Sequence, residues 1–386
     1  MTNWPVKTLG DVCEVIAGQS PEGKFYNQAG QGTPFYQGKK DFTERFLGSP
    51  STWTTEITKL AQPGDILMSV RAPVGPVNLC PIEACIGRGL AAIRPSIEAH
   101  TEFIYYYLES IQSEIAGTEG AVFATINKAQ IANLRCPVPP LDEQKRIVTL
   151  LDDATARITE LTACYEKVCT HTKDLLESSL LELFADAFAS HPKRKMGEVL
   201  QIARGGSPRP IGEYITKSPK GVNWIKIGDA SASKKYIFET AERIRPEGVS
   251  RSRMVYPGDF LLSNSMSFGR PYIMKTEGCI HDGWLVLRDS KGELDQDFLF
   301  YLLGSRFMYE RFSQLAAGST VQNLNSSLVS SVEIPVPPID LQKKIATKAI
   351  EIEEKVSRLT ENFQLKLQAI DEMRQSILEA AFAGEL

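Results

Sequence analysis

The side chains best suited to bind a ligand in this chain are long hydrogen-bond donors and cations in loops flanked by Gly or Pro. Arg, Lys, Asn and Gln donate to phosphate oxygens, and they also pair with the edges of nucleobases. In the first half of the chain the candidates are Gln37, Lys39, Lys40, Arg71 and Arg88. In the second half they are Arg209, Lys226, Lys234, Lys235, Asn264 and Arg270. These residue types predict binding rather than bond cleavage.

Sequence patterns for catalysis are incomplete. Residues 18–24 have the GxxxxGK spacing of a phosphate-binding loop, but Phe25 stands where such a loop needs Ser or Thr to hold magnesium. A structural turn explains this segment better. The four histidines are too scattered for an acid–base cluster, and the seven cysteines form no CxxC pair that would indicate a metal site. We therefore predict no catalytic residue and no bound metal.

The candidate residues lie in a chain whose sequence is internally duplicated. The segment PVPPLD at residues 137–142 recurs as PVPPID at residues 335–340, and PGDIL at 63–67 recurs as PGDFL at 257–261. A repeat of this length is too long for a solenoid unit and indicates a duplicated domain. Duplicated binding surfaces commonly recognise a target that has two parts.

Each repeat begins with a globular part. Short runs of β-branched and aromatic residues alternate with Gly and Pro, and one helical stretch follows, near residues 101–115 in the first repeat and 295–316 in the second. This pattern predicts two α+β domains. The expected divisions are a first domain at 1–140, a helix at 141–190, a second domain at 191–338 and a second helix at 339–386.

A long amphipathic helix is expected after each Pro-rich hinge. Apolar residues recur there at alternating spacings of four and three, which is the pattern of a coiled-coil seam. The predicted seam residues are Ile147, Leu151, Ile158, Leu161, Ile345, Ile352, Val356 and Leu359. Because a single rod would leave its seam exposed, we expect the two helices to form an antiparallel coiled coil with pseudo-two-fold symmetry between the repeats.

Composition and charge set the outer limits. The chain has 386 residues, 42% of them hydrophobic, with a formal net charge of −4. It has no leader and no apolar run long enough to cross a membrane, so we expect a cytoplasmic protein. Residues 191–290 carry 17 Lys and Arg against 10 Asp and Glu, whereas residues 141–190 carry 5 against 10. A basic second domain suits DNA, and an acidic helix suits a protein partner.

Several motifs, in order along the whole chain, resemble one known family. They are FYQGKKDF at 35–42, SVRAPVGPV at 69–77, CIGRGLAAI at 85–93, the hinges PVPPLDEQKRI and IPVPPIDLQKKIA, and the ending SILEAAFAGEL. Together with the order of domain, hinge, helix, domain, hinge and helix, they are similar to the DNA-specificity subunit of type I restriction-modification systems. The globular domains then correspond to that family's target-recognition domains.

The resemblance implies a function and a set of partners. Each domain is expected to recognise one half of a bipartite, asymmetric site in double-stranded DNA, and the helices are expected to set the gap between the halves. Two adenine methyltransferase subunits would dock on the helices, and two restriction subunits would join the complex. S-adenosylmethionine, ATP and Mg would belong to those partners, so the chain itself would be a non-enzymatic subunit without a cofactor.

Two other functions remain as alternatives. The chain could be a non-enzymatic scaffolding protein, with duplicated protein-binding domains on a coiled-coil rod. It could also be a solitary nuclease or methyltransferase, which the incomplete catalytic motifs disfavour. Dependence of DNA binding on salt would separate the first alternative from the specificity subunit, because phosphate contacts weaken steeply as the salt concentration rises.

Overall fold

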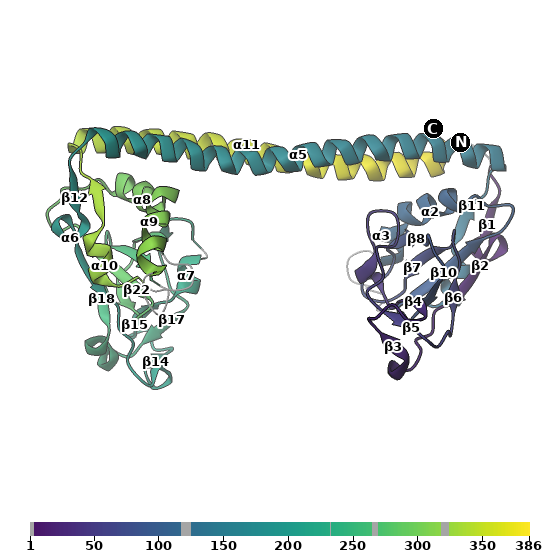
Figure 1. Ribbon diagram of the computed structural model, residues 1–386, viewed down its shortest axis with the longest axis horizontal. Coiled ribbons are helices and arrows are strands. Elements are labelled where there is room, and N and C mark those ends of the chain that lie inside the picture. Colours follow the sequence, from purple (N-terminus) through teal and green to yellow (C-terminus); the bar gives the residue numbers. More distant parts are fainter. Residues whose placement is uncertain (1–3, 117–124, 232, 265–268, 318–323) are drawn as a thin grey trace. The chain divides into compact units, whose positions relative to one another are not determined.

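The computed structural model describes residues 4–116, 125–231, 233–264, 269–317 and 324–386. The chain forms two compact units, and each takes part of both long helices (Figure 1). Unit 1 combines Met1–Glu166 with Gln364–Leu386, and unit 2 consists of Lys167–Phe363. The long helices are α5 (Leu141–Ser190) and α11 (Ile339–Ala383), and each begins directly after a Pro-rich hinge.

Unit 1 contains three sheets. The first pairs β1 (Val6–Thr8) with β11 (Arg135–Pro137). The second has the order β2 (Cys13–Ala17), β10 (Leu90–Pro95), β7 (Ile66–Ser69) and β8 (Val77–Leu79). The third has the order β3 (Tyr26–Asn27), β5 (Trp53–Thr54), β4 (Thr33–Tyr36), β9 (Ala84–Ile86) and β6 (Leu60–Ala61).

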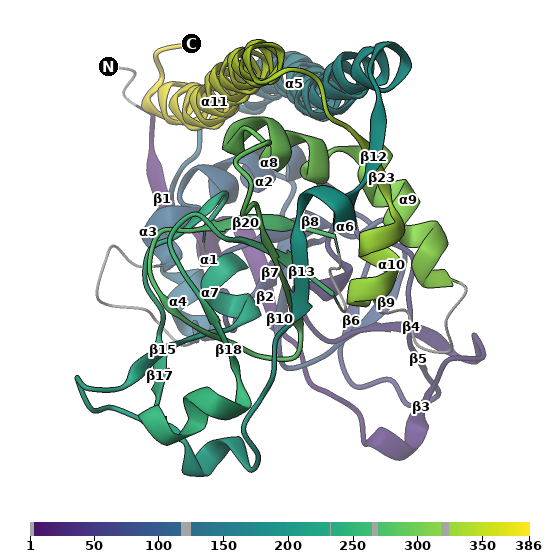
Figure 2. The same ribbon diagram turned by 90° about the vertical axis from the view of Figure 1, so that its left-hand side faces the viewer.

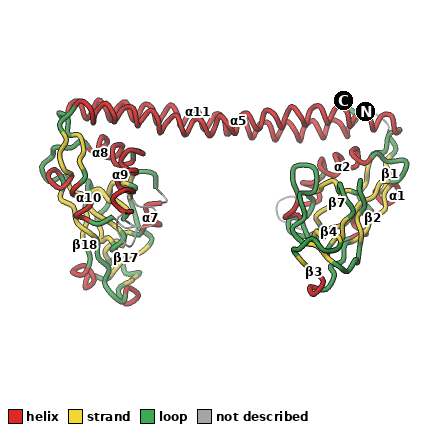
Figure 3. Tube along the Cα trace, viewed as in Figure 1, coloured by secondary structure: helices red, strands yellow, loops and turns green. Residues whose placement is uncertain are grey.

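The shorter helices of unit 1 lie between and beside these sheets. They are α1 (Leu9–Val12), η1 (Gly23–Phe25), η2 (Lys39–Asp41), α2 (Thr101–Ser110), α3 (Gln112–Ala116) and α4 (Lys128–Ala132). Within the unit, α2 lies between the strands and the long helices (Figures 1 and 3). One apolar core joins these layers, and it includes Phe103 of α2, Ile147 and Leu151 of α5, and Leu378 and Ala381 of α11.

Unit 2 repeats the three sheets of unit 1. The small sheet pairs β12 (Lys193–Lys195) with β23 (Glu333–Pro335). The next has the order β13 (Gln201–Arg204), β22 (Trp284–Arg288), β19 (Phe260–Ser263), β20 (Pro271–Met274) and β16 (Tyr236–Ile237). The last has the order β14 (Ile215–Thr216), β17 (Glu242–Ile244), β15 (Val222–Ile225), β21 (Gly278–Ile280) and β18 (Arg253–Val255).

The helices of unit 2 repeat the plan as well. They are α6 (Met196–Val199), η3 (Ile211–Glu213), α7 (Ile227–Ser231), η4 (Pro246–Arg251), α8 (Gln296–Gly304), α9 (Arg306–Ala317) and α10 (Ser326–Ser331). In this unit α8 lies under the long helices (Figure 2). Phe184 at the end of α5 and Ala349 near the start of α11 share its core with Phe298 of α8. The expectation of two duplicated α+β domains with two long helices is confirmed.

The repeated PGD segment is a structural turn. Gly64 and Gly258 have φ of +91° and +96°, a conformation that glycine adopts without strain. Asp65 Oδ2 then accepts a hydrogen bond of 2.8 Å from the backbone N–H of Gln62, and both of its oxygens accept from the Arg94 guanidinium. Asp259 makes the same double contact with Arg288. The charged pair thus holds the turn before the central strand of each domain.

Each expected helical stretch in the domains is interrupted. In unit 1, α2 ends at Ser110, and Ile111 has φ −99° and ψ +10° before α3 begins. In unit 2, Ser305 is extended, with φ −69° and ψ +148°, and its hydroxyl donates back to the carbonyl of Leu302. Each predicted helical stretch is thus divided into two shorter helices, at residue 111 in unit 1 and at residue 305 in unit 2.

The long helices run antiparallel inside unit 1. Arg146, near the start of α5, donates 2.6 Å to the backbone carbonyl of Leu386 beyond the end of α11. The ammonium of Lys366 lies 5.5 Å from the ring centroid of Tyr165, so the later part of α5 meets an earlier part of the same α11 segment. In unit 2 the end of α5 and the beginning of α11 share one core, which fits the same direction.

Most of the predicted seam residues are shielded from solvent. Ile147, Leu151, Ile158, Ile345 and Val356 are buried, and Ile352 is half-buried.

The seam placement of Leu161 and Leu359 is wrong, because their exposed fractions are 45% and 44%. Thr162 and Thr360, one residue further along, are half-buried instead. The heptad repeat itself continues past the two leucines, since Thr172 and Ile370, which lie two heptads after Ile158 and Val356, are buried.

A buried glutamine joins each long helix to its domain. In unit 1, Gln144 Oε1 accepts from the backbone N–H of His100 at 2.7 Å, and its Nε2 donates to the carbonyls of Glu98 and Pro139 at 3.0 and 2.9 Å. In unit 2, Gln342 makes the same three bonds, to Asp295, Glu293 and Pro337. Both glutamines are 0% exposed. Each one therefore fixes the hinge, the domain and the first turn of the helix together.

The buried glutamine predicts a clear effect on stability. Gln144→Ala leaves three buried backbone groups without partners, so the free energy of unfolding should fall by about 3 kcal/mol. Urea denaturation followed by near-ultraviolet circular dichroism measures it. Lys145→Ala, at the exposed neighbouring position, should change the value by less than about 0.5 kcal/mol. Equal effects of the two substitutions would contradict a structural role for the glutamine.

Candidate nucleic-acid interface

The two domains share one backbone arrangement at the ends of their central strands. Gly18 donates to the carbonyl of Leu90 and Gly205 to that of Trp284, both at 2.9 Å. A serine two residues later accepts from a backbone N–H with its hydroxyl, which is Ser20 with Arg88 at 3.2 Å and Ser207 with Asp282 at 3.4 Å. We call the residues that follow β4 and β9 in unit 1, and β15 and β21 in unit 2, the loop edge.

The loop edge of unit 1 brings together three of the predicted residues. Gln37 follows β4 and Arg88 follows β9, and these two strands pair in parallel. Gly89 lies against Gln37, since a Cβ on it would come within 2.3 Å of the Gln37 carbonyl. Arg71 enters from a third strand, because Val70 donates 2.9 Å to the carbonyl of Gly89. The side chains of Gln37, Arg71 and Arg88 are all exposed.

Two further candidates extend this edge. Lys39 and Lys40 lie in the short helix η2, directly after Gln37, and both are exposed. Together with Arg71 and Arg88 they give the edge four cations. Such a set of donors suits phosphates and the acceptor atoms of nucleobases.

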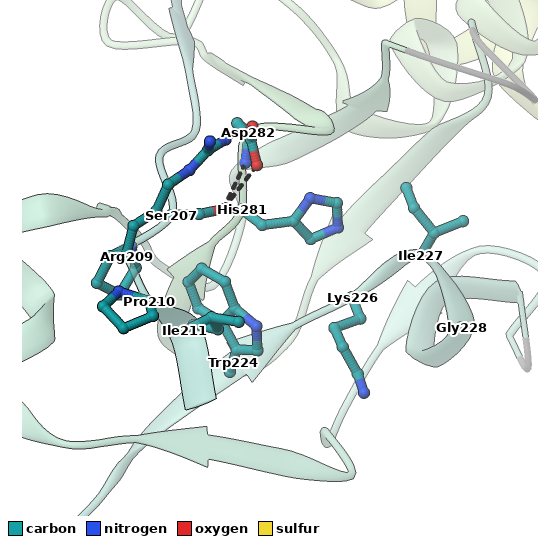
Figure 4. Close-up of a pocket in the computed structure, with 11 residues that line it drawn as sticks. Ser207, Arg209, Pro210, Ile211, Trp224, Lys226, Ile227, Gly228, His281 and Asp282 are labelled. Atoms are coloured by element: carbon teal, nitrogen blue, oxygen red, sulfur yellow. Dashed lines mark hydrogen bonds and ion pairs between the residues drawn. The ribbon is translucent and has the colours of Figure 1, made fainter. Parts of the chain in front are cut away.

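The loop edge of unit 2 contains a cavity of about 1040 Å³. Ser207, Arg209, Trp224, Lys226, His281 and Asp282 are among the residues that line it. In Figure 4 the His281 ring lies near Trp224, with Arg209 on one side and Lys226 on the other. The predicted residues Arg209 and Lys226 thus come together, although their roles as DNA contacts remain predictions.

Electrostatic contacts fix the chemistry of this cavity. Asp282 accepts from the Ser207 hydroxyl at 2.6 Å and from Arg209 Nη2 at 3.4 Å. The Ser207 hydrogen bond lowers the pKa of Asp282, so the carboxylate is charged near neutral pH. Burial lowers the pKa of His281, so its ring is neutral there. Because Nδ1 of His281 accepts from the N–H of Gly283 at 2.8 Å, the neutral ring carries its proton on Nε2.

The cations of this cavity differ in how firmly they are held. Lys226 forms an ion pair of 2.6 Å with Glu242. Arg209 is far more exposed, with 81% of its side chain accessible, and its contact with Asp282 is long. Surface pairs of this kind contribute little stability. The Arg209 guanidinium can therefore leave Asp282 for a ligand at small cost.

Lys235 has a structural position that its sequence context does not reveal. Its ammonium is 2.6 Å from Asp297 and 4.7 and 5.1 Å from the ring centroids of Phe300 and Tyr301. Only 19% of its side chain is accessible. Arg45 of unit 1 makes the corresponding contacts with Asp152 and the rings of Tyr105 and Tyr106. We assign Lys235 to domain packing, which corrects its choice as a DNA contact.

Asn264 also has a structural position. It is 2% exposed, and its amide donates 2.9 Å to the carbonyl of Asp282. A buried amide bonded to the backbone supports the loop edge from behind rather than contacting DNA, which again corrects the prediction. Lys234 and Arg270 are exposed and remain candidates.

Sequence reasoning missed Asp282 as part of the site. The predicted contacts are hydrogen-bond donors and cations, and a carboxylate is neither. The available signal was the repeat itself, since Asp282 stands three residues after the Cys279 that corresponds to Cys85. The same count from Cys85 leads to Arg88.

The described residues contain neither a cluster of metal ligands nor a helix suited to a membrane. In these parts of the chain, His, Cys, Asp and Glu do not gather in groups of three or more that could hold a metal ion. Among the same residues, none of the helices combines the length and the apolar composition needed to span a membrane.

Comparison with protein families gives one consistent result. A family model described as "Type I restriction modification DNA specificity domain" matches residues 1–167 and 192–366. A Methanocaldococcus jannaschii protein named putative type I restriction enzyme MjaX specificity subunit is 42% identical over 153 residues, which cover 39% of this chain and 36% of that relative. The MjaIX specificity subunit of the same organism is 20% identical over 436 residues, covering 100% of this chain and 94% of its own.

Solved structures share the fold. A chain from work described as "Structural basis underlying complex assembly and conformational transition of the type I R-M system" has a TM-score of 0.78 at 22% identity, covering 99% of this chain and 98% of its own. The HsdS subunit from Thermoanaerobacter tengcongensis has a TM-score of 0.60 at 21% identity, covering 100% and 98%.

The placement of Lys235 predicts a difference between adjacent lysines. Lys235→Ala removes an ion pair and cation–π contacts that are largely shielded from solvent, so the free energy of unfolding should fall by about 1–2 kcal/mol. Lys234→Ala removes only an exposed side chain and should change it by less than about 0.5 kcal/mol. Thermal unfolding of the two variants measures the difference. A larger effect at Lys234 would contradict the assignment.

Proposed function

Because the chain belongs to the family of type I restriction-modification DNA specificity proteins, we propose that each of its domains recognises one half of a bipartite, asymmetric DNA site. The observation that carries the proposal is the loop edge. One backbone arrangement occurs in both domains, with Arg88 in one and Asp282 in the other. The same backbone arrangement with different side chains would allow the two domains to recognise different base sequences in the same way.

The family assignment settles the class of function. The chain is a specificity subunit and is not itself catalytic. We assign the methylation and cleavage steps to partner subunits, which would also bind S-adenosylmethionine, ATP and magnesium. The complex would act in the cytoplasm, where chromosomal DNA is accessible. A scaffold with duplicated protein-binding domains is set aside, because the matched family is defined by DNA specificity.

Exposed apolar residues on the long helices support docking of two methyltransferase copies. Leu161 of α5 and Leu359 of α11 are equivalent in the repeat, and so are Leu175 and Met373. Their exposed fractions are 45% and 44% for the first pair, and 52% and 41% for the second. Large apolar side chains at equivalent exposed positions suit two similar protein interfaces. Two restriction subunits would then join through the methyltransferases.

DNA methylation tests the proposed function directly. The chain and its candidate adenine methyltransferase are co-expressed in a host without adenine methylation, and N6-methyladenine is mapped by single-molecule sequencing. We expect a bipartite motif with a constant unspecified gap that is absent without this chain. A methyltransferase that produces the same motif alone would contradict the assignment, and so would a stable complex that binds no DNA.

Helix docking predicts a change in subunit count. Leu161→Asp with Leu359→Asp places two charges at the exposed apolar positions, so the number of bound methyltransferase copies should fall from two to none. Native mass spectrometry counts the subunits. Replacing Lys145 and Lys343, which are also exposed and equivalent, by Ala should leave two copies bound. Two copies on the Asp variant would exclude these residues from the interface.

A further inference from the structure

Resting on the proposed function, we infer that positions 88 and 282 select bases of opposite hydrogen-bonding character in the two half-sites. Arg88 selects a guanine in the half-site of the first domain. Asp282 selects a base with an exocyclic amino group, cytosine or adenine, in the half-site of the second. The two positions are the same place in the repeated fold.

The equivalence of the two positions follows from their matching backbone contacts. Each residue donates its backbone N–H to the hydroxyl of the corresponding serine, Ser20 or Ser207. Each stands three residues after a cysteine whose strand pairs in parallel with the strand of an aromatic residue, Phe35↔Cys85 in unit 1 and Trp224↔Cys279 in unit 2. The side chains at 88 and 282 therefore leave equivalent points of the fold.

The side chains at the two positions have opposite hydrogen-bonding character. The Arg88 side chain is exposed, and a guanidinium has donors only. It matches the two acceptors O6 and N7 of guanine in the major groove. An ionised carboxylate has acceptors only, and Asp282 keeps 42% of its side chain accessible. Asp matches the N4 amino group of cytosine, and the N6 amino group of adenine offers the same donor.

A carboxylate can face DNA at this place because cations surround it. Arg209 contacts Asp282 directly, and Lys226 lines the same cavity. Their charges offset the repulsion between Asp282 and the phosphates. The Ser207 hydroxyl occupies one carboxylate oxygen at 2.6 Å, whereas Arg209 holds the other only at 3.4 Å. The second oxygen is therefore the one that an amino group can take, while Arg209 turns to the backbone of the DNA.

The residues next to these two positions also differ between the domains. Gly87 precedes Arg88, and a Cβ on it would come within 3.1 Å of Gln37 Cα, so a side chain there would require its neighbours to shift. His281 precedes Asp282 and lines the cavity with a ring whose proton is on Nε2. Gln37 and Lys226, which each follow the Tyr36 or Ile225 of the parallel pair, also differ in charge. The cavity of unit 2 therefore suits a different base from the one that the loop edge of unit 1 suits.

Selection of binding sites from a pool of randomised duplexes tests the inference. The complex of the full chain with its methyltransferase is used, and bound duplexes are sequenced. Arg88→Ala should lower discrimination about tenfold to a hundredfold at one guanine in the half-site of the first domain. Asp282→Ala removes the acceptor and should do the same at one cytosine or adenine in the other half-site. In each case the second half-site serves as the control and should stay unchanged.

Other outcomes have distinct meanings. Uniform loss of affinity across all sequences, with a smaller salt dependence, would show a phosphate contact and overturn the inference. An unchanged motif in both variants would also overturn it. Asp282→Glu keeps the acceptor, so it should retain the preferred base with weaker discrimination even if the Ala variant fails to fold. If the unaltered complex selects no bipartite motif, the proposed function itself fails.

Discussion

The buried glutamine at the start of each long helix is the contact on which the rest of the structure depends. Gln144 and Gln342 each accept one backbone hydrogen bond from the domain and donate one to the domain and one to the Pro-rich hinge. Three buried bonds at one residue leave little freedom between a domain and the first turn of its helix. A protein that measures a distance between two DNA segments needs such a rigid connection, because a loose hinge would accept many gap lengths.

The structure separates a constant framework from variable side chains. Three features recur in both domains and hold the backbone. They are the charged pairs such as Asp65 with Arg94, the buried glutamines and the glycine turns. The loop edge uses that backbone to present different groups. Arg88 and Asp282 show the difference most clearly, because their backbone hydrogen bonds match while their charges are opposite. Specificity can therefore change without disturbing the core.

Local sequence signals predicted the framework well. The Pro-rich hinges and the heptad spacing are short-range patterns, and α5 and α11 begin directly after the hinges, at residues 141 and 339. Leu161 and Leu359 fit the heptad spacing but are exposed, and apolar spacing alone does not reveal that difference. The breaks at Ile111 and Ser305 depend on backbone angles that no apolar spacing reveals.

The candidate site was harder to predict, because burial decides which cations are available. Lys234 and Lys235 are adjacent lysines, yet Lys234 is exposed whereas Lys235 packs between Asp297 and two aromatic rings. Asn264 carries a suitable amide but uses it on the backbone of Asp282. Conversely, Asp282 gains its place only from the fold, which sets it beside Ser207 and Arg209, residues more than seventy positions earlier.

We propose that the helices set the distance between two independently read half-sites, and this role can be tested by lengthening both helices. Duplicating residues 158–164 in α5 and the equivalent 356–362 in α11 adds one heptad, or about 10 Å of helix. At 3.4 Å per base pair, the methylated motif should keep both half-sites while its gap grows by about three base pairs. An unchanged gap, or altered half-sites with the same gap, would contradict the account.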